Sequence, residues 1–369
     1  MNLYKKLILG AFLLFTFLRL NLFAGDLKHR GQVSLWTRPI NTLNEWRLNL
    51  GLRFFPEITF KQYLNSEMFF DAELSLNGFL QTDFDNSDKD LKLYRLKLRF
   101  ATAQSETRIG LQQLNFGPAQ ILRSLMWFDK IDPRDPLNMT DGVYGIRYRY
   151  SFLNNSGIWL WGLYGNESTK GYEVYSTAKK KPEFGGRYQF PVPDGEMAAT
   201  FHTREVNAGN FEYRENRFAL DGRWDIEIGF WFESVFQHSN SDLLPYKWQK
   251  NLTLGADYTF GIGSGLYTVI EHMGVFASNK ILGNDSDSEI SAFMLSYPVG
   301  MFDNLSAIGY YSWNQKKFYQ YTQWQRSYDS FLINIGAFYY PSGGSTSISQ
   351  NENIPLSGYG LQVMFIYNY

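Results

Sequence analysis

Apolar and polar residues alternate with a period of two along most of the chain. From Glu45 to Phe54, every even-numbered residue is apolar and every odd-numbered residue is charged, polar or glycine. The pattern recurs, with single exceptions, in Met68–Asn77, Tyr94–Phe100, Tyr144–Phe152, Ile226–Glu233 and Leu252–Phe260. Because successive side chains of a strand point to opposite faces, this alternation predicts β-strands with one apolar and one polar face.

The connections between the expected strands are short and long in turn. The short ones include Thr102–Ser105, Leu153–Gly157, Pro193–Gly195, Trp224–Asp225 and Gly261–Gly265. The long ones include Asn115–Asp141, Asn166–Lys181, His238–Tyr246, Ala277–Asp287 and Pro341–Leu356. Short turns at one end and long loops at the other are typical of antiparallel barrels that cross an outer membrane.

We therefore predict one all-β domain over residues 25–369, a transmembrane antiparallel up-and-down β-barrel of about 18 strands, with 16 as the alternative count. Strands of about 11 residues leave room for loops but none for a plug domain. A soluble β-sandwich is the alternative fold. The barrel is favoured because many tryptophans fall near expected strand ends, as aromatic girdles at membrane interfaces require. They are Trp159, Trp161, Trp224, Trp231, Trp248, Trp313 and Trp324.

The N-terminal segment has the features of a signal peptide. Lys5 and Lys6 precede the apolar run Leu7–Leu18, and small residues follow at Ala24 and Gly25. The run is shorter than the ~20 residues that span a bilayer as a helix. We expect residues 1–24 to be a cleaved signal peptide, with an N-terminal anchor helix as the alternative.

The C-terminal residues alternate to the end of the chain, which closes on an aromatic. Their apolar positions are Tyr359, Leu361, Val363, Phe365, Tyr367 and Tyr369. This resembles the C-terminal strand signal read by the outer-membrane assembly machinery, with Tyr369 where phenylalanine is more usual. The resemblance implies the bacterial outer membrane as location, with its lipid and that machinery as partners.

Composition excludes several classes of function. The formal charge of −1 argues against a nucleic-acid partner, and the absence of cysteine removes thiolate metal sites and cysteine nucleophiles. The four histidines (His29, His202, His238 and His272) lack metal-binding spacing. His272 near Ser278 is read as incidental. We expect no enzyme activity, catalytic residue, cofactor or metal.

Charged residues of the polar faces fall on neighbouring expected strands. Three successive strands carry a basic set, made of Arg95, Lys97, Arg99, Arg108, Arg147 and Arg149. The preceding strand carries an acidic set, made of Glu67, Asp71 and Glu73. Because neighbouring strands lie about 4.8 Å apart, we expect a basic wall and an acidic face lining a pore. The alternative is a ladder of salt bridges that only stiffens the barrel.

The connection Asn115–Asp141 is the longest that the pattern predicts. Ile121, Leu122, Leu125 and Met126 recur at helical spacing, which predicts a short helix over Pro118–Trp127. The charged residues that follow are Asp129, Asp132, Arg134 and Asp135. We expect the loop to fold inward as a constriction, with its acids facing the basic wall. A surface loop with solvated charges is the alternative.

The stretch Arg108–Gly117, followed by Asp132–Pro136, resembles a pattern of porin-like and alginate-export-like outer-membrane barrels. In those barrels a strand ending in Gln and Trp-Gly leads into an Asp/Pro-rich loop; here Phe116 replaces the tryptophan. The resemblance implies passage of small polar or anionic solutes, or export of an acidic polysaccharide. A non-conducting surface barrel that acts in adhesion or partner binding is the alternative function.

Overall fold

The computed structural model describes residues 25–42, 45–83, 86–341 and 358–369. Residues 1–24, which we expect to be a signal peptide, and most of the connection after Tyr340 lie outside this part. In the described residues the chain forms 18 strands, and no helix there is long and apolar enough to cross a membrane. The strands are β1 (Asp26–Thr42), β2 (Glu45–Tyr63), β3 (Phe69–Thr82), β4 (Ser87–Ala101), β5 (Ser105–Gln112), β6 (Val143–Ser151), β7 (Gly157–Leu163), β8 (Glu183–Val192), β9 (Gly195–Asn207), β10 (Glu212–Asp225), β11 (Gly229–Asn240), β12 (Trp248–Phe260), β13 (Leu266–Ser278), β14 (Ser286–Val299), β15 (Asp303–Ser312), β16 (Lys317–Ser327), β17 (Phe331–Tyr340) and β18 (Gly358–Asn368).

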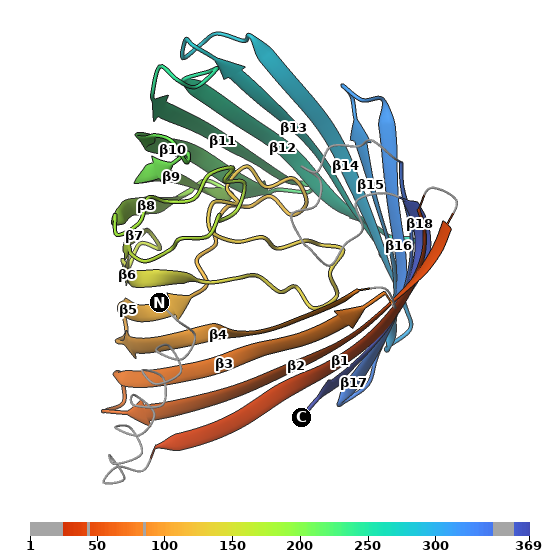
Figure 1. Cartoon of the computed structure of the whole chain (residues 1–369). Coiled ribbons are helices and arrows are strands. Elements are labelled where there is room, and N and C mark those ends of the chain that lie inside the picture. The colour runs from red at the N-terminus through yellow and green to blue at the C-terminus, as the bar shows by residue number, and fades with distance from the viewer. Residues whose placement is uncertain (1–24, 43–44, 84–85, 342–357) are drawn as a thin grey trace.

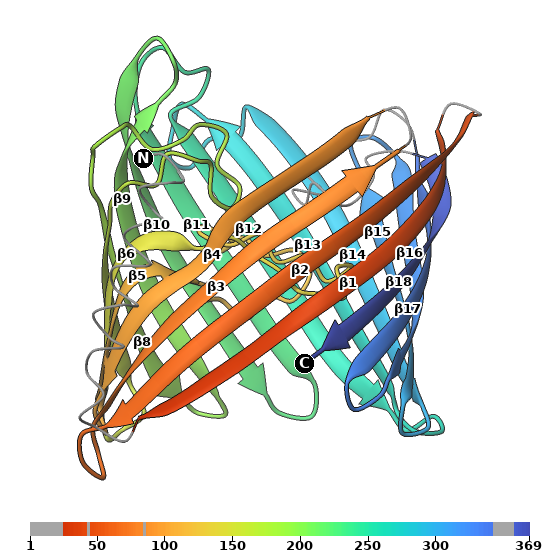
Figure 2. The same cartoon turned by 60° about the horizontal axis from the view of Figure 1, so that its bottom comes forward.

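The strands form one closed antiparallel barrel (Figure 1). Each strand pairs with the next along the chain, and β1 pairs with both β2 and β18. Figure 2 shows the strong tilt that a closed barrel imposes on its strands. The predicted up-and-down barrel of 18 strands is confirmed, and the alternative count of 16 is wrong.

The outer face of the barrel is apolar and the hydrogen bonds of its backbone are internal. In β18, Leu361 is 53% exposed whereas Ile366, of the opposite parity, is 2% exposed. All six apolar positions of the C-terminal pattern share this outward face. Closure leaves no strand edge, so the backbone groups of the spanning segments are satisfied within the sheet, as a lipid environment requires.

One expected turn lies elsewhere along the chain. Trp224 and Asp225 belong to β10, and Asp225 pairs with Gly229, so the turn is Ile226–Ile228. The alternating pattern over Ile226–Glu233 predicts that Ile226 and Ile228 belong to the next strand. Their side chains are instead exposed at the short-turn end, because a tight turn also leaves apolar residues on its outer side.

The lumen face is apolar over one sector of the barrel. Residues of β13–β17 that point inward form a buried cluster with the loop between β5 and β6. They are Val269, Ala292, Ile308, Tyr310, Tyr319, Tyr321, Phe338 and Tyr340. The rule of apolar outside and polar inside therefore fails here, because a protein segment rather than water covers this wall.

Several of the tryptophans expected in the interfacial girdles face the lumen instead, and two of them are buried there. Trp231 is fully buried, and its indole N–H donates to Glu271 at 3.1 Å. Trp161 is buried in a second cluster with Phe116, Leu125 and other loop residues. Both side chains therefore pack against the loop and do not contact lipid.

We predict that deleting residues 359–369 abolishes assembly. Loss of β18 would leave β17 and β1 with unpaired edges, and each unsatisfied backbone group in a bilayer costs several kcal/mol. Heat-modifiable migration in gels and surface protease accessibility measure insertion. The variant Tyr369→Phe, which keeps the strand, is the matched control and should insert normally. Surface insertion of the truncated chain would contradict this prediction.

Candidate functional site

The connection between β5 and β6, residues 113–142, lies inside the barrel and is called the inward loop (Figure 1). Its residues from Ile121 to Asp129 are all buried. The loop packs against the lumen face of β7, β10, β11 and β13–β17 in two clusters. The alternative of a solvated surface loop is therefore wrong for this segment.

Glu233, on the lumen face of β11, is one anchor of the inward loop. Its carboxylate accepts the backbone N–H groups of Ala119 and Leu125, at 3.0 and 2.8 Å. The side chain is fully buried. Gly117, with φ of 96°, lets the loop pass close by, since a Cβ at Gly117 would lie 2.3 Å from a carboxylate oxygen of Glu233.

Glu271, on β13, is the second anchor and is also fully buried. Its carboxylate accepts the backbone N–H groups of Gln120 at 2.7 Å, Ile121 at 3.0 Å and Leu122. The hydroxyl of Thr253, on the strand between the two anchors, donates to the carbonyl of Leu122 at 2.8 Å. The two carboxylates thus hold five backbone N–H groups of the loop, four consecutive ones and that of Leu125, against β11–β13.

The helix expected over Pro118–Trp127 does not form. The segment consists of turns, bends and irregular residues, because the amides that a helix would use donate to Glu233 and Glu271 instead. The apolar spacing has a different cause. Ile121 and Leu122 enter the cluster on β13–β17, whereas Leu125 enters the cluster around Trp161.

The acids of the inward loop pair within the loop. Asp129 accepts a hydrogen bond of 2.5 Å from Arg123, and Asp132 accepts a bidentate contact from Arg134, at 2.9 and 2.6 Å. Asp135 accepts the backbone N–H of Leu137 at 3.0 Å. The expected pairing of Asp129 and Asp132 with the basic wall is therefore wrong. Burial raises the pKa of Asp129, and the Arg123 guanidinium opposes this effect and favours the ionised form.

The second half of the loop follows the lumen wall from β15 and β17 to β1 and β4. The Arg134 guanidinium lies over the rings of Tyr310 and Tyr340, 5.4 Å from each centroid. Leu137 then packs against the cluster of Trp36. The loop ends where the carbonyl of Thr140 accepts a 2.9 Å hydrogen bond from Arg95 on β4. The loop therefore contacts the lumen wall around much of its circumference.

The structure brings most of the basic set together with acids. Lys97 pairs with Glu73 at 2.6 Å, and Arg99 pairs with Asp71 at 2.6 Å. Glu106, on β5, bridges Arg99, Arg108 and Arg147, at 3.4, 2.8 and 2.6 Å. The salt-bridge ladder that was the alternative interpretation is therefore present, and the role of this patch as the wall of a pore stays a prediction. Sequence reasoning missed Glu106, although it shares the inward parity of Arg108.

Three members of the expected sets have other positions. Glu67 lies in the turn between β2 and β3 and not on the acidic face, because the side chain of Asn65 accepts its backbone N–H and ends the strand. Arg95 is buried and holds the inward loop. Arg149 is exposed, with its guanidinium 4.9 Å from the ring of Trp159.

A second loop, residues 164–182 between β7 and β8, carries a buried ionic network that the sequence did not suggest. Lys170 pairs with Glu183 at 3.0 Å and with Glu173 at 3.3 Å. Glu173 also pairs with Arg204 on β9 at 3.0 Å and with Arg217 on β10 at 3.2 Å. This loop is thereby tied to the wall beside the inward loop.

His202 and His272 have hydrogen-bond partners within the barrel. The Nδ1 atom of His202 accepts the indole N–H of Trp161 at 3.2 Å, which leaves Nε2 to donate to Glu183 at 3.2 Å. His272 shares a 2.9 Å hydrogen bond with Ser291, not with Ser278. The described residues contain no group of three or more side chains able to hold a metal ion.

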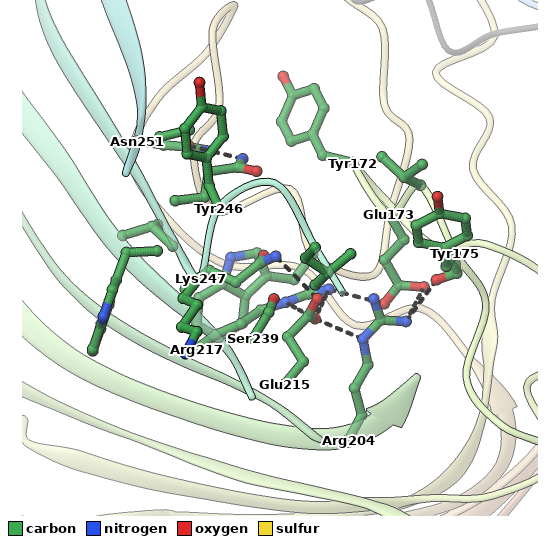
Figure 3. A pocket seen from close by; sticks show the side chains of 18 of the residues that line it. Tyr172, Glu173, Tyr175, Arg204, Glu215, Arg217, Ser239, Tyr246, Lys247 and Asn251 are labelled. Carbon is green, nitrogen blue, oxygen red and sulfur yellow. Dashed lines mark hydrogen bonds and ion pairs between the residues drawn. The ribbon is translucent and has the colours of Figure 1, made fainter. Parts of the chain in front are cut away.

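Two pockets lie on opposite sides of the inward loop. The larger, of about 280 Å³, is on the long-loop side and includes Trp127, Tyr172, Arg204 and Lys247 in its lining (Figure 3). The smaller, of about 150 Å³, is lined by Phe116, Arg187, Arg223 and others near the short turns. The inward loop therefore separates an outer space from an inner space of the lumen.

A closed antiparallel barrel with an apolar outer face and its longest described loop in the lumen is the fold of bacterial outer-membrane porins. No protein-family model and no curated protein matches the sequence. Solved structures, however, match over most of the chain. OccAB1 of Acinetobacter baumannii has a TM-score of 0.59 at 8% identity, covering 94% of this chain and 96% of its own.

Two further structures are similar to this chain. OccK5 (OpdH) of Pseudomonas aeruginosa has a TM-score of 0.56 at 12% identity, covering 94% of this chain and 97% of its own. The anion-selective porin of Comamonas acidovorans has a TM-score of 0.55 at 10% identity, covering 94% and 100%. Identities this low establish the fold that these proteins share.

We predict that the double variant Glu233→Ala, Glu271→Ala releases the inward loop from the wall. Five backbone N–H groups would lose their acceptors, at about 1–3 kcal/mol for each buried group. Trypsin should then cleave after Arg123 and Lys130, which mass spectrometry detects, while the barrel stays folded in gels. The control Glu205→Ala removes an acid from the outer face of β9. Equal resistance of the double variant and the native protein to trypsin would contradict the anchoring role of Glu233 and Glu271.

Proposed function

We propose that the protein is a porin-type channel of the bacterial outer membrane that passes small polar solutes, with a preference for anions. The observation that carries this proposal is the inward loop held across the lumen of a closed barrel. Such a loop narrows a water-filled passage, while the hydrogen bonding between the strands stays unchanged. The apolar outer face and the outward C-terminal side chains support the location.

The inward loop occupies part of the lumen, which favours small solutes over a polysaccharide as the transported substrate. Two buried clusters join the loop to β7, β10, β11 and β13–β17, and the pockets on either side measure about 280 and 150 Å³. A polymer chain would need a continuous wide bore. Export of an acidic polysaccharide would therefore require the loop to leave its anchors.

The charge of the lumen wall supports anion preference. The basic set has six members, and the acids that pair with it are Asp71, Glu73 and Glu106, so cations exceed carboxylates in this patch. Pairs that contact water contribute little stability. An excess of one sign of charge on a wall of low dielectric constant nevertheless raises the local concentration of counter-ions.

We predict that replacing residues 118–135 by a short Gly-Ser linker raises single-channel conductance severalfold in planar bilayers. The barrel ladder is complete without the loop, so the variant should still insert. A matched control shortens the rim loop between β13 and β14 by removing residues 281–284. Unchanged conductance and an unchanged solute-size cutoff would place the loop outside the conducting path. Absence of ion conductance in the native protein would contradict the channel and favour a non-conducting surface barrel.

We predict that Arg149→Glu shifts the reversal potential toward cations in a salt gradient. Arg149 is the exposed member of the basic set and contacts Trp159, so its reversal leaves the ion pairs of Glu106 intact. The control is Arg214→Glu, because Arg214 lies on the outer face of β10 and pairs with Glu205 at 2.6 Å. An equal shift of the reversal potential in both variants would show that the basic wall does not set the ion preference.

A further inference from the structure

We propose that the larger pocket is a binding site for a small neutral carbohydrate that enters from the long-loop side. This inference deepens the proposed function, on which its role in transport rests. The pocket, of about 280 Å³, lies between the inward loop, the second loop and strands β9–β13. Its volume is close to the lower end of the range of small-ligand sites, and it combines aromatic with polar groups, as such sites do.

The ionic groups of the pocket are matched among themselves. Arg204 donates to Glu215 at 2.7 Å and to the carbonyl of Tyr175 at 3.0 Å. Arg217 donates to Glu215 at 2.9 and 2.7 Å, and Glu173 pairs with both guanidinium groups. Figure 3 shows these pairs as one connected network along the floor of the pocket.

The matched charges select against an ionic ligand. Arg204, Glu215 and Arg217 are all buried, so an incoming carboxylate would compete with Glu215 for donors that are already engaged. Lys247, at the rim, pairs with Asp242. A neutral ligand meets no such competition, because it can share the outward lone pairs and N–H groups of the network without displacing either charge.

The remaining polar groups of the pocket are neutral and suited to hydroxyl groups. Gln237, Ser239, Gln249 and Asn251 line it from β11 and β12. Amide and hydroxyl side chains both donate and accept hydrogen bonds, and so does each hydroxyl of a sugar. One amide of this set, Gln237, already donates to Glu215 at 2.9 Å and extends the network toward the cavity.

Aromatic side chains complete the site. Tyr172 and Tyr175 of the second loop and Tyr246 of the loop between β11 and β12 line the cavity next to the ionic network (Figure 3). Trp127 and Trp248 also line the cavity. An aromatic ring offers an apolar face with a polar edge or tip, which complements the C–H face and hydroxyl edges of a pyranose ring.

The basic wall lies elsewhere in the lumen. It lies on β4–β6, whereas the pocket is lined by β9–β13 and the two loops. A neutral solute bound in the pocket would therefore be recognised by groups different from those that set ion preference. The two properties are separable by mutation.

The test uses the full-length protein in planar bilayers with maltose as the probe. We expect maltose to interrupt the ion current in a saturable way, and gluconate at equal concentration to do so at least tenfold more weakly. The double variant Tyr175→Ala, Tyr246→Ala should weaken the block by maltose at least fivefold. Both tyrosines belong to loops, so the barrel ladder is unaffected. The matched control is Tyr328→Ala, an exposed tyrosine at the short-turn end.

A second measurement separates failure of the site from failure of the channel. Maltose should change the tryptophan fluorescence of the detergent-solubilised protein, because Trp127 and Trp248 line the pocket, and the double variant should reduce this change. If the protein conducts no ions but binds maltose, the channel fails and the site stands. Equal binding by the double variant, no response to maltose, or a stronger response to gluconate would overturn the carbohydrate site.

Discussion

A buried backbone amide needs an acceptor, and in this barrel two carboxylates of the wall satisfy that need for a whole segment. Glu233 and Glu271 accept the amides of a loop that has no secondary structure of its own. Without them, the loop could not lie against β11–β13, since unsatisfied backbone groups are costly inside protein. The position of the loop, the division of the lumen and the form of both pockets depend on this contact.

The barrel consequently has two kinds of inner wall. From β3 to β6 the lumen face carries partly exposed ion pairs, such as Lys97 with Glu73. From β13 to β17 it carries Tyr310, Phe338 and other buried apolar residues. The first wall leaves charged side chains partly exposed to the lumen, whereas the second supports the loop. One sheet performs both tasks because the side chains of a strand can differ from sector to sector while its hydrogen bonding stays constant.

The architecture was predictable because the outer surface of a barrel obeys a simple rule at every strand. Alternating residues in β2 and β18 identified faces that the structure confirms, and the count of 18 strands followed. The interior obeys no such rule, since a loop residue can meet any strand. The spacing of Ile121, Leu122 and Leu125 therefore indicated a helix that does not form. A usable signal existed in β13, where Glu271 is an isolated acid between Val269 and Met273 on the lumen face.

The path of the inward loop along the lumen wall has a consequence for the order in which the barrel assembles. The loop is synthesised before β10–β17, yet Leu122 and Arg134 contact residues of β12, β15 and β17. Contacts between segments so far apart in sequence form late, after the intervening chain has been ordered. Until then, its apolar side chains have no partner, and a segment in that state is prone to aggregate. The loop that is anchored in the finished lumen thus leaves apolar side chains uncovered for as long as the barrel is unfinished.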